Sequence, residues 1–331
     1  MKKKWIVGAA IALAVVVALL GCAVGLSHLI WHRSLRATIY ERICAHRNAK
    51  SRTAAEEIAR LEALRAVERR AYAIPESTHF DVSVERGERE GMSFFTLNAR
   101  EDAPATLFYL HGGAYIHGFN PYHWRLLNRL ARSTGAEIVA PDYPLVPYSD
   151  CVGTGRDVLA VYLDCVAARP GRRILLMGDS AGGGLALQLA EALVRDGLPL
   201  PERLILFSPW VDVTMENPDI GKYVSVEPIL HLELVKVHGR FWAGDLDPHD
   251  WRASPLFGEM TGLPPVTLYA GTRELLYPDL LLLNDALSAA GVDVDFHIGT
   301  GLNHEYPLMP IPEADRALRE VEKTILGGAT P

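Results

Sequence analysis

The chain has 331 residues, of which 49% are hydrophobic and 22% are charged, and its formal net charge is −7. This hydrophobic content is ample for a sizeable core, and the length allows one or two domains. A negative net charge without a basic block argues against nucleic acid as a partner.

The first predicted element is an apolar helix at the amino terminus. Three lysines at positions 2–4 precede residues 5–31, which carry no formally charged side chain apart from a protonatable His28. A bilayer span needs only about 20 apolar residues. The sequence therefore predicts an uncleaved, single-helix membrane anchor over residues 1–32. Arginines follow the run on its other side, so the orientation in the membrane stays open.

A cleaved signal is the alternative interpretation of this apolar run. Residues 19–22 read Leu-Leu-Gly-Cys, similar to the processing site of bacterial lipoproteins, which would leave Cys22 lipidated. The run continues beyond Cys22, whereas the apolar region of a signal is usually about 7–15 residues long. We therefore favour the uncleaved anchor. A buried core helix fits poorly with such a length behind a lysine cluster.

An amphipathic helix is predicted next, over residues 51–72. Its apolar side chains recur at helical spacing, and the charged side chains lie mostly on the other face. Pro75 should end the helix before the first strand. Residues 33–75 are thus expected to form a helical segment between the anchor and a larger domain over residues 76–331.

Six apolar runs of strand length follow, separated by helix-compatible segments. This alternation predicts an α/β fold with a mostly parallel, doubly wound sheet. The runs cover residues 106–110, 137–140, 173–177, 203–207, 266–270 and 292–298.

The first of these runs leads into His111, Gly112 and Gly113. Acyl transfer creates an oxyanion, which needs hydrogen-bond donors already aimed at it, and glycines let backbone amides approach closely. Gly112 and Gly113 are therefore candidate oxyanion donors. A plain β-turn is the alternative for a lone pair of glycines.

A candidate nucleophile stands at the end of the third run. Residues 178–182 read Gly-Asp-Ser-Ala-Gly, between an apolar strand and a helical segment. A serine between glycines at such a junction is the nucleophile elbow of an α/β-hydrolase. Ser180 is the predicted nucleophile, and the amide of Ala181 is a third candidate oxyanion donor. A glycine-rich turn that only packs a strand on a helix is the alternative.

A serine nucleophile needs a base, and the chain order of this fold places the acid and then the histidine after it. His297 shares the polar face of the last predicted strand with two aspartates, so we expect it to be a solvated strand residue. His304 lies in the loop after that strand and is the predicted general base. Three other histidines follow Ser180 in a stretch without strand pattern: His231, His238 and His249.

The acid has two candidates in the loop after residues 266–270. Asp279 follows Pro278, and this pair is typical of the first turn of a helix, where a carboxylate complements the helix dipole. Glu274 has no such structural role and lies four residues beyond the strand. Glu274 is therefore the predicted partner of His304.

Taken together, these motifs resemble the hormone-sensitive lipase family of esterases, which also includes arylacetamide deacetylase. The resemblance runs from about residue 103 to about residue 325. It rests on residues 111–115 (HGGAY), 178–183 (GDSAGG), 208–212 (SPWVD), 254–256 (SPL), 262–265 (GLPP) and 301–304. Three positions depart from the family pattern: the third glycine of HGGG is Ala114, residues 143–148 replace YRLAPE, and Glu274 stands at the position of the usual aspartate.

The resemblance implies an α/β-hydrolase with a helical cap, built from the N-terminal helices and an insertion over about residues 211–251. It implies a carboxylesterase or lipase-like enzyme that cleaves short-to-medium acyl or lipid-like esters through an acyl-enzyme, with the triad Ser180, Glu274 and His304. Removal of acetyl groups from amides is one alternative. A ligand-binding protein without catalysis is another, since gibberellin receptors resemble this family but have lost the histidine. The oligomeric state stays open.

The apolar side chains of the cap insertion have two interpretations: they line an acyl pocket, or they are simply core. The residues concerned are Ile229, Leu230, Leu234, Val237, Phe241 and Trp242.

No cofactor or metal is implied. Residues 178–184 lack the Gly-Lys-Ser/Thr of a phosphate loop, and residues 153–155 lack the third glycine of a dinucleotide site. The four cysteines form no CxxC pair. Cys151 and Cys165 flank a predicted helix, which separates them too far for a disulfide.

Overall fold

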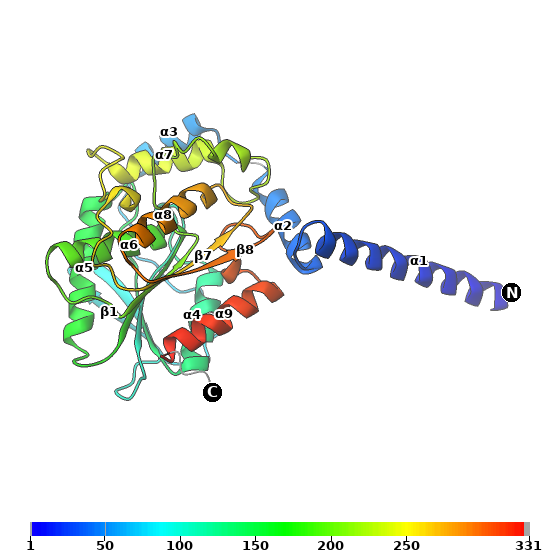
Figure 1. Cartoon of the computed structure of the whole chain (residues 1–331), viewed down its shortest axis with the longest axis horizontal. Coiled ribbons are helices and arrows are strands. Elements are labelled where there is room, and N and C mark those ends of the chain that lie inside the picture. The colour runs from blue at the N-terminus through cyan, green and yellow to red at the C-terminus, as the bar shows by residue number, and fades with distance from the viewer. Residues whose placement is uncertain (1, 50, 328–331) are drawn as a thin grey trace.

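The computed structural model describes residues 2–49 and 51–327, and it leaves out the side chains of residues 2–14 and of Leu20. Helix α1 (Lys2–Leu29) projects away from the body of the protein, and α2 (Leu35–Asn48) connects it to that body (Figure 1). Within these described parts, no helix is long and apolar enough to cross a membrane. The predicted anchor over residues 1–32 falls partly on side chains outside the description and stays a prediction.

The body is built on an eight-stranded sheet in the order β1-β2-β4-β3-β5-β6-β7-β8. Strands β3 to β8 run parallel, whereas β1 and β2 form an antiparallel hairpin that pairs with β4 through β2. The strands are β1 (Val84–Arg89), β2 (Met92–Leu97), β3 (Thr106–Leu110), β4 (Glu137–Pro141), β5 (Ile174–Asp179), β6 (Arg203–Phe207), β7 (Val266–Gly271) and β8 (Val294–Gly299). The prediction of a mostly parallel sheet is confirmed.

Helices cover both faces of this sheet, which explains why its central strands are continuous apolar runs. The helices are α4 (Pro121–Thr134), α5 (Cys151–Ala167), α6 (Ser180–Arg195), α8 (Tyr277–Ala289) and α9 (Pro312–Ile325). Phe108 and Leu110 of β3 pack into the core under α5, α6 and α8. Leu107 and Tyr109 of the same strand pack into the core on the opposite face, under α4 and α9. Cys151 and Cys165 lie near the two ends of α5 and are unpaired thiols, as their predicted separation requires.

Two helices from distant parts of the chain lie side by side over one edge of the sheet (Figure 1). They are α3 (Ala54–Leu64), which precedes the first strand, and α7 (Leu232–Ala243), which lies between β6 and β7. Thr53 and Glu56 form a capping box at the start of α3. We call α3, α7 and the loops that flank α7 the cap.

The predicted helix over residues 51–72 is too long, because α3 ends at Leu64. Long-range contacts hold the remainder in a non-helical path. The amide of Tyr72 donates to Asp142 Oδ2 at 3.2 Å, and its hydroxyl accepts a hydrogen bond from Trp124 Nε1 at 2.8 Å. The Tyr72 ring also packs edge-on against Phe95. Burying this ring between α4 and β2 outweighs the helical pattern of the segment.

Candidate active site

The carboxyl ends of four strands bring the predicted site residues to one edge of the sheet. Ser180 directly follows β5, and Gly112 lies two residues after β3. Glu274 follows β7, and His304 lies in the loop after β8. Ligands of open α/β sheets bind at this carboxyl edge. The fold therefore brings together Gly112 and His304, which lie 192 positions apart in the sequence.

Ser180 occupies the sharp turn between β5 and α6, with a left-handed φ of +49°. The turn has no room for side chains two residues away. A Cβ on Gly178 would overlap the carbonyl oxygen of Gly182, and a Cβ on Gly182 would overlap that of Leu110 at the end of β3. The glycines thus permit the strained backbone that lifts the serine hydroxyl above the sheet.

Ser180, His304 and Glu274 form a continuous chain of hydrogen bonds. Ser180 Oγ lies 2.9 Å from His304 Nε2, and His304 Nδ1 lies 2.7 Å from Glu274 Oε2. The amide of Gly271 donates to the other oxygen of Glu274 at 2.9 Å. The three side chains are shielded from water, because Ser180 is 5%, His304 1% and Glu274 0% exposed. The structure thus brings together the three residues that were predicted as a triad.

The rival candidates make their hydrogen bonds elsewhere. His297 Nε2 lies 2.8 Å from Asp295 on β8, on the partly exposed face where it was expected. His238 of α7 pairs with Glu57 of α3 at 3.0 Å and so joins the two cap helices. Asp279 lies in the first turn of α8, as predicted, and accepts a hydrogen bond from Asn217 at 2.7 Å.

The Gly112 amide, one of the predicted oxyanion donors, has another acceptor in the structure. This amide donates to Asp179 Oδ2 at 3.0 Å and is therefore already occupied. Gly113 adopts φ +126° and Ala114 adopts φ +52°, and their amides have no acceptor within the part of the chain that the structure describes. Ala181 lies in the first turn of α6, where amides have no partner within the helix.

Asp179 is a fully buried carboxylate that the sequence analysis did not single out. It accepts hydrogen bonds from the Tyr109 hydroxyl and the Gly112 amide, and His123 Nε2 lies 3.2 Å from Oδ2. Burial opposes ionisation, but His123, followed by hydrogen bonds from Glu305 and Tyr109, outweighs it and lowers the pKa of Asp179. Asp179 therefore ties the glycine turn after β3 to the elbow that carries Ser180.

Glu305 brings a further carboxyl group to the site. It directly follows His304, adopts φ +54°, and its amide donates to Ser208 Oγ at 3.0 Å. Its Oε1 lies 3.8 Å from His304 Nε2, the nitrogen that also faces Ser180. Burial and the charge of Asp179, with which it shares a hydrogen bond, raise the pKa of Glu305 well above its usual range.

The carboxyl groups around His304 favour its charged form. Burial lowers the pKa of the imidazole, but Glu305 and Glu274 outweigh burial and raise it to about 9. Glu227 of the cap also contributes, and its Oε2 accepts a hydrogen bond from the Leu275 amide at 3.0 Å. Burial raises the pKa of Glu227 to about 7. The cap thus contacts the residue that follows Glu274.

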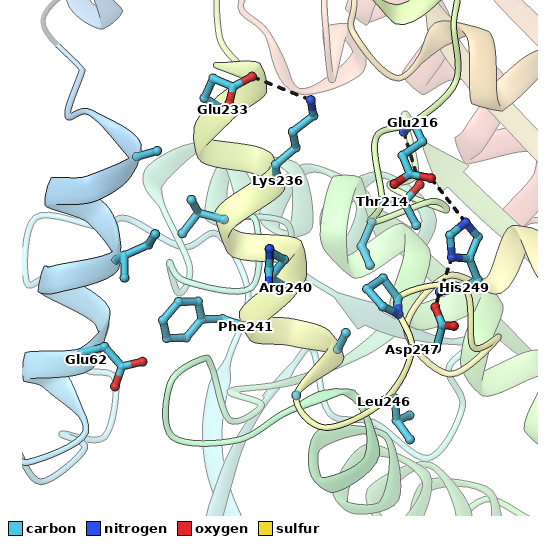
Figure 2. A pocket seen from close by; sticks show the side chains of 17 residues that line it. Glu62, Thr214, Glu216, Glu233, Lys236, Arg240, Phe241, Leu246, Asp247 and His249 are labelled. Carbon is cyan, nitrogen blue, oxygen red and sulfur yellow. Dashed lines mark hydrogen bonds and ion pairs between the residues drawn. The ribbon is translucent and has the colours of Figure 1, made fainter.

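The cap contains a separate cavity of about 1010 Å³ between α3, α7 and the loops around His249 (Figure 2). Val237 and Phe241 of α7 line it, together with the charged side chains of Lys236 and Arg240. Trp242 does not line this cavity but is core, because its ring stacks on Tyr115 at a centroid distance of 3.6 Å. Of these α7 residues, Val237 and Phe241 thus face a cavity, and Trp242 belongs to the core.

This combination of fold and site defines the class of protein. A serine at a strand-to-helix elbow, hydrogen-bonded to a histidine at the carboxyl edge of a mostly parallel sheet, is the arrangement of the α/β-hydrolases. A family model described as alpha/beta hydrolase fold matches residues 107–308. The chain belongs to this family and, within it, is a hormone-sensitive lipase-like carboxylic ester hydrolase.

Known relatives cover most of the chain. It is 35% identical over 238 residues to an acetyl-hydrolase of Streptomyces hygroscopicus, which is 70% of this chain and 78% of that protein. It is 30% identical over 231 residues to an esterase of Acinetobacter venetianus, 68% of this chain and 76% of that protein. A solved hormone-sensitive lipase from a metagenome library superposes with a TM-score of 0.74 at 25% identity, covering 87% of this chain and 97% of that one.

Proposed function

We propose that the chain is a serine esterase that cleaves short-to-medium acyl or lipid-like esters through an acyl-enzyme. The observation that carries the proposal is the hydrogen-bond chain from Ser180 Oγ through His304 to Glu274. In such a chain the imidazole accepts the serine proton, and the carboxylate holds the imidazole in the correct tautomer. A glutamate performs this role as well as an aspartate, since only the carboxylate is required.

The reaction would proceed in two halves. Ser180 Oγ attacks the ester carbonyl carbon while His304 Nε2 takes its proton, and the imidazolium then gives this proton to the departing alcohol. Water next attacks the acyl-serine, His304 takes a proton from that water, and Ser180 recovers its proton as the acid leaves. The amides of Gly113 and Ala181 would hold the oxyanion, with Ala114 in place of Gly112, whose amide is occupied by Asp179.

Removal of an acetyl group from an amide is the second candidate reaction. One relative is named an acetyl-hydrolase, and this name supports an acetyl group as the acyl part of the substrate. A ligand-binding protein without catalysis is disfavoured, because His304 is present and hydrogen-bonded to Ser180.

Attachment to a membrane through residues 1–32 is part of the proposal. It rests on the lysines at 2–4 and on the long apolar run that follows them. The intact mass of the amino-terminal peptide, isolated from membranes, distinguishes an uncleaved anchor from lipidation of Cys22.

Labelling with a fluorophosphonate probe tests the enzymatic proposal. The probe forms a covalent bond with an activated serine, so the wild-type chain should be labelled and Ser180→Ala should not. Turnover of p-nitrophenyl acetate and butyrate should vanish in the same variant. Labelling of Ser180→Ala, or hydrolysis within threefold of wild type, would remove Ser180 from the mechanism.

A further inference from the structure

The bend between α1 and α2 is in direct contact with the loop that carries His304. The backbone of Gly301 comes so close to Trp31 that a Cβ on Gly301 would overlap the Trp31 carbonyl oxygen. Gly301 has φ +72°, a conformation that favours glycine. This contact joins segments 270 residues apart, since 301 − 31 = 270.

Arg33 is the main polar link at this bend. It is only 3% exposed, although arginine is almost never fully buried unless it is paired. Its Nη1 donates to the carbonyl oxygen of Gly301 at 2.8 Å and also pairs with the Glu41 carboxylate, while its Nε donates to Thr38 Oγ1 at 3.0 Å. One buried guanidinium thus holds α2 against the histidine loop.

Glu41 extends the link to the loop that carries the acid. It is 7% exposed and accepts two hydrogen bonds from Arg273, Nε to Oε2 at 3.0 Å and Nη2 to Oε1 at 3.2 Å. Burial opposes ionisation, but hydrogen bonds from Arg33 and Arg273 outweigh it and lower the pKa of Glu41. Arg273 directly precedes Glu274, the residue that orients His304. Glu41 therefore holds the residue next to the predicted catalytic acid.

The two loops are also tied to each other beside this ion cluster. The amide of Arg273 donates to the Leu302 carbonyl at 2.9 Å, and the amide of Gly301 donates to Thr272 Oγ1 at 2.9 Å. A shift of either loop would therefore change the distance between Glu274 and His304. The cluster of Arg33, Glu41 and Arg273 contacts both loops, because Arg33 bonds Gly301 of one loop and Glu41 bonds Arg273 of the other.

From this geometry we propose that Arg33 and Glu41 are positioning residues, which hold the loops of Glu274 and His304 in register and so make catalysis depend on the segment that follows α1. The inference rests on the proposed esterase function. None of these side chains faces Ser180 directly, so their effect should appear in kcat rather than in KM.

The test compares full-length variants. Arg33→Met removes the guanidinium but keeps most of its length, and Glu41→Gln removes the charge but keeps the shape. We expect each to lower kcat for p-nitrophenyl acetate about 10- to 100-fold, with KM within about twofold. Arg33→Lys keeps the charge and should recover a large part of the loss.

Glu313→Gln is the matched control. Glu313 of α9 accepts hydrogen bonds from the Ser34 amide at 2.6 Å and the Ser34 hydroxyl at 2.9 Å, so it holds the same helix α2. Within the described residues it makes no hydrogen bond or ion pair to the loops of Glu274 and His304. We expect its kcat to match wild type. A loss equal to that of Arg33→Met would overturn the proposal, because general loosening of α2 would then explain both variants.

Melting temperatures separate positioning from unfolding. If Arg33→Met is not folded, the kcat of the isosteric variant Glu41→Gln decides whether the proposal holds. Wild-type kcat in a folded Glu41→Gln would overturn the inference. If the fluorophosphonate probe does not label the wild-type protein, the proposed function is overturned instead. Failure of the inference and failure of the proposed function are therefore distinguishable.

Discussion

The side chain of Glu305 should set the pH at which the enzyme becomes active. Its Oε1 lies 3.8 Å from His304 Nε2, so the ionised form of Glu305 stabilises the imidazolium. Burial opposes this charge, but Glu305 and Glu274 together raise the pKa of His304 to about 9. Only the neutral imidazole can accept the serine proton, so kcat/KM should rise with pH up to that range. Glu305→Gln should move this rise to lower pH.

The distance gives the size of the shift. Two unit charges 3.8 Å apart interact with about 1 kcal/mol in a water-like medium and with about 4 kcal/mol at an effective dielectric constant of about 20. Since about 1.4 kcal/mol corresponds to one pH unit, these limits give about one to three pH units. We expect a value near the lower limit, because Asp179 raises the pKa of Glu305 and so reduces its average charge.

The assay is kcat/KM for a neutral, short-chain ester between pH 5 and 10, measured by pH-stat titration. Glu320→Gln is the control, because Glu320 lies on the exposed face of α9, where it pairs with Lys323 at 3.1 Å. Its profile should match wild type. If the profile of Glu305→Gln also superposes on wild type, Glu305 carries no charge that acts on His304, and the reasoning is refuted.

Three further predictions follow from the site and the fold. His304→Ala should lower turnover about 10³-fold or more, as expected for members of a coupled triad, whereas His297→Ala should be nearly silent in the same ester assay. Glu274→Gln should lower kcat about 10²- to 10⁴-fold at an unchanged melting temperature, because the amide favours the wrong tautomer of the imidazole. Burial raises the pKa of Asp279 to about 7, so the wild-type free energy of unfolding should fall as pH rises from about 4 to 7. Because Glu227 contributes in the same pH range, Asp279→Asn should show a smaller fall than wild type between pH 5 and pH 8, measured by urea denaturation. An equal fall in the two proteins would contradict the prediction.

Strands β3 to β7 could be predicted because burial on both faces makes them continuous apolar runs. Strand β8 lies at the sheet edge and could be predicted from its alternation of apolar and polar residues. Strand β1, the outer strand of the hairpin that it forms with β2, was missed because it shows neither of these patterns. Strand β1 reads Val-Glu-Arg-Gly-Glu-Arg and lies at the sheet edge, where charged side chains face water. No apolar alternation is required at such an edge, so the sequence pattern gave no signal.

The site residues that lie just after a strand were also predictable, because the strands themselves could be recognised. Ser180, Glu274 and His304 each lie a few residues after a recognisable strand, and chain order restricts which of them can meet. Glu227 was not predictable, because it reaches Leu275 from a cap loop with no regular pattern. Arg33 and Glu41 were likewise not predictable. Their partners in the catalytic loops, Gly301 and Arg273, lie 268 and 232 positions away in the sequence.

The acceptor of the Gly112 amide could not be predicted from the sequence, and the reason is physical. Glycines after a strand indicate that backbone amides can approach a ligand, but they do not indicate which amide is still free. Asp179 is the last residue of β5, and its buried carboxylate requires donors. The Gly112 amide is one of them, at 3.0 Å. The same absence of a Cβ that suggested an oxyanion hole admits Asp179 Oδ2 and Glu305 Oε1 instead, because a side chain on Gly112 would collide with both. Among the described residues, the amides without an acceptor therefore begin one residue later, at Gly113.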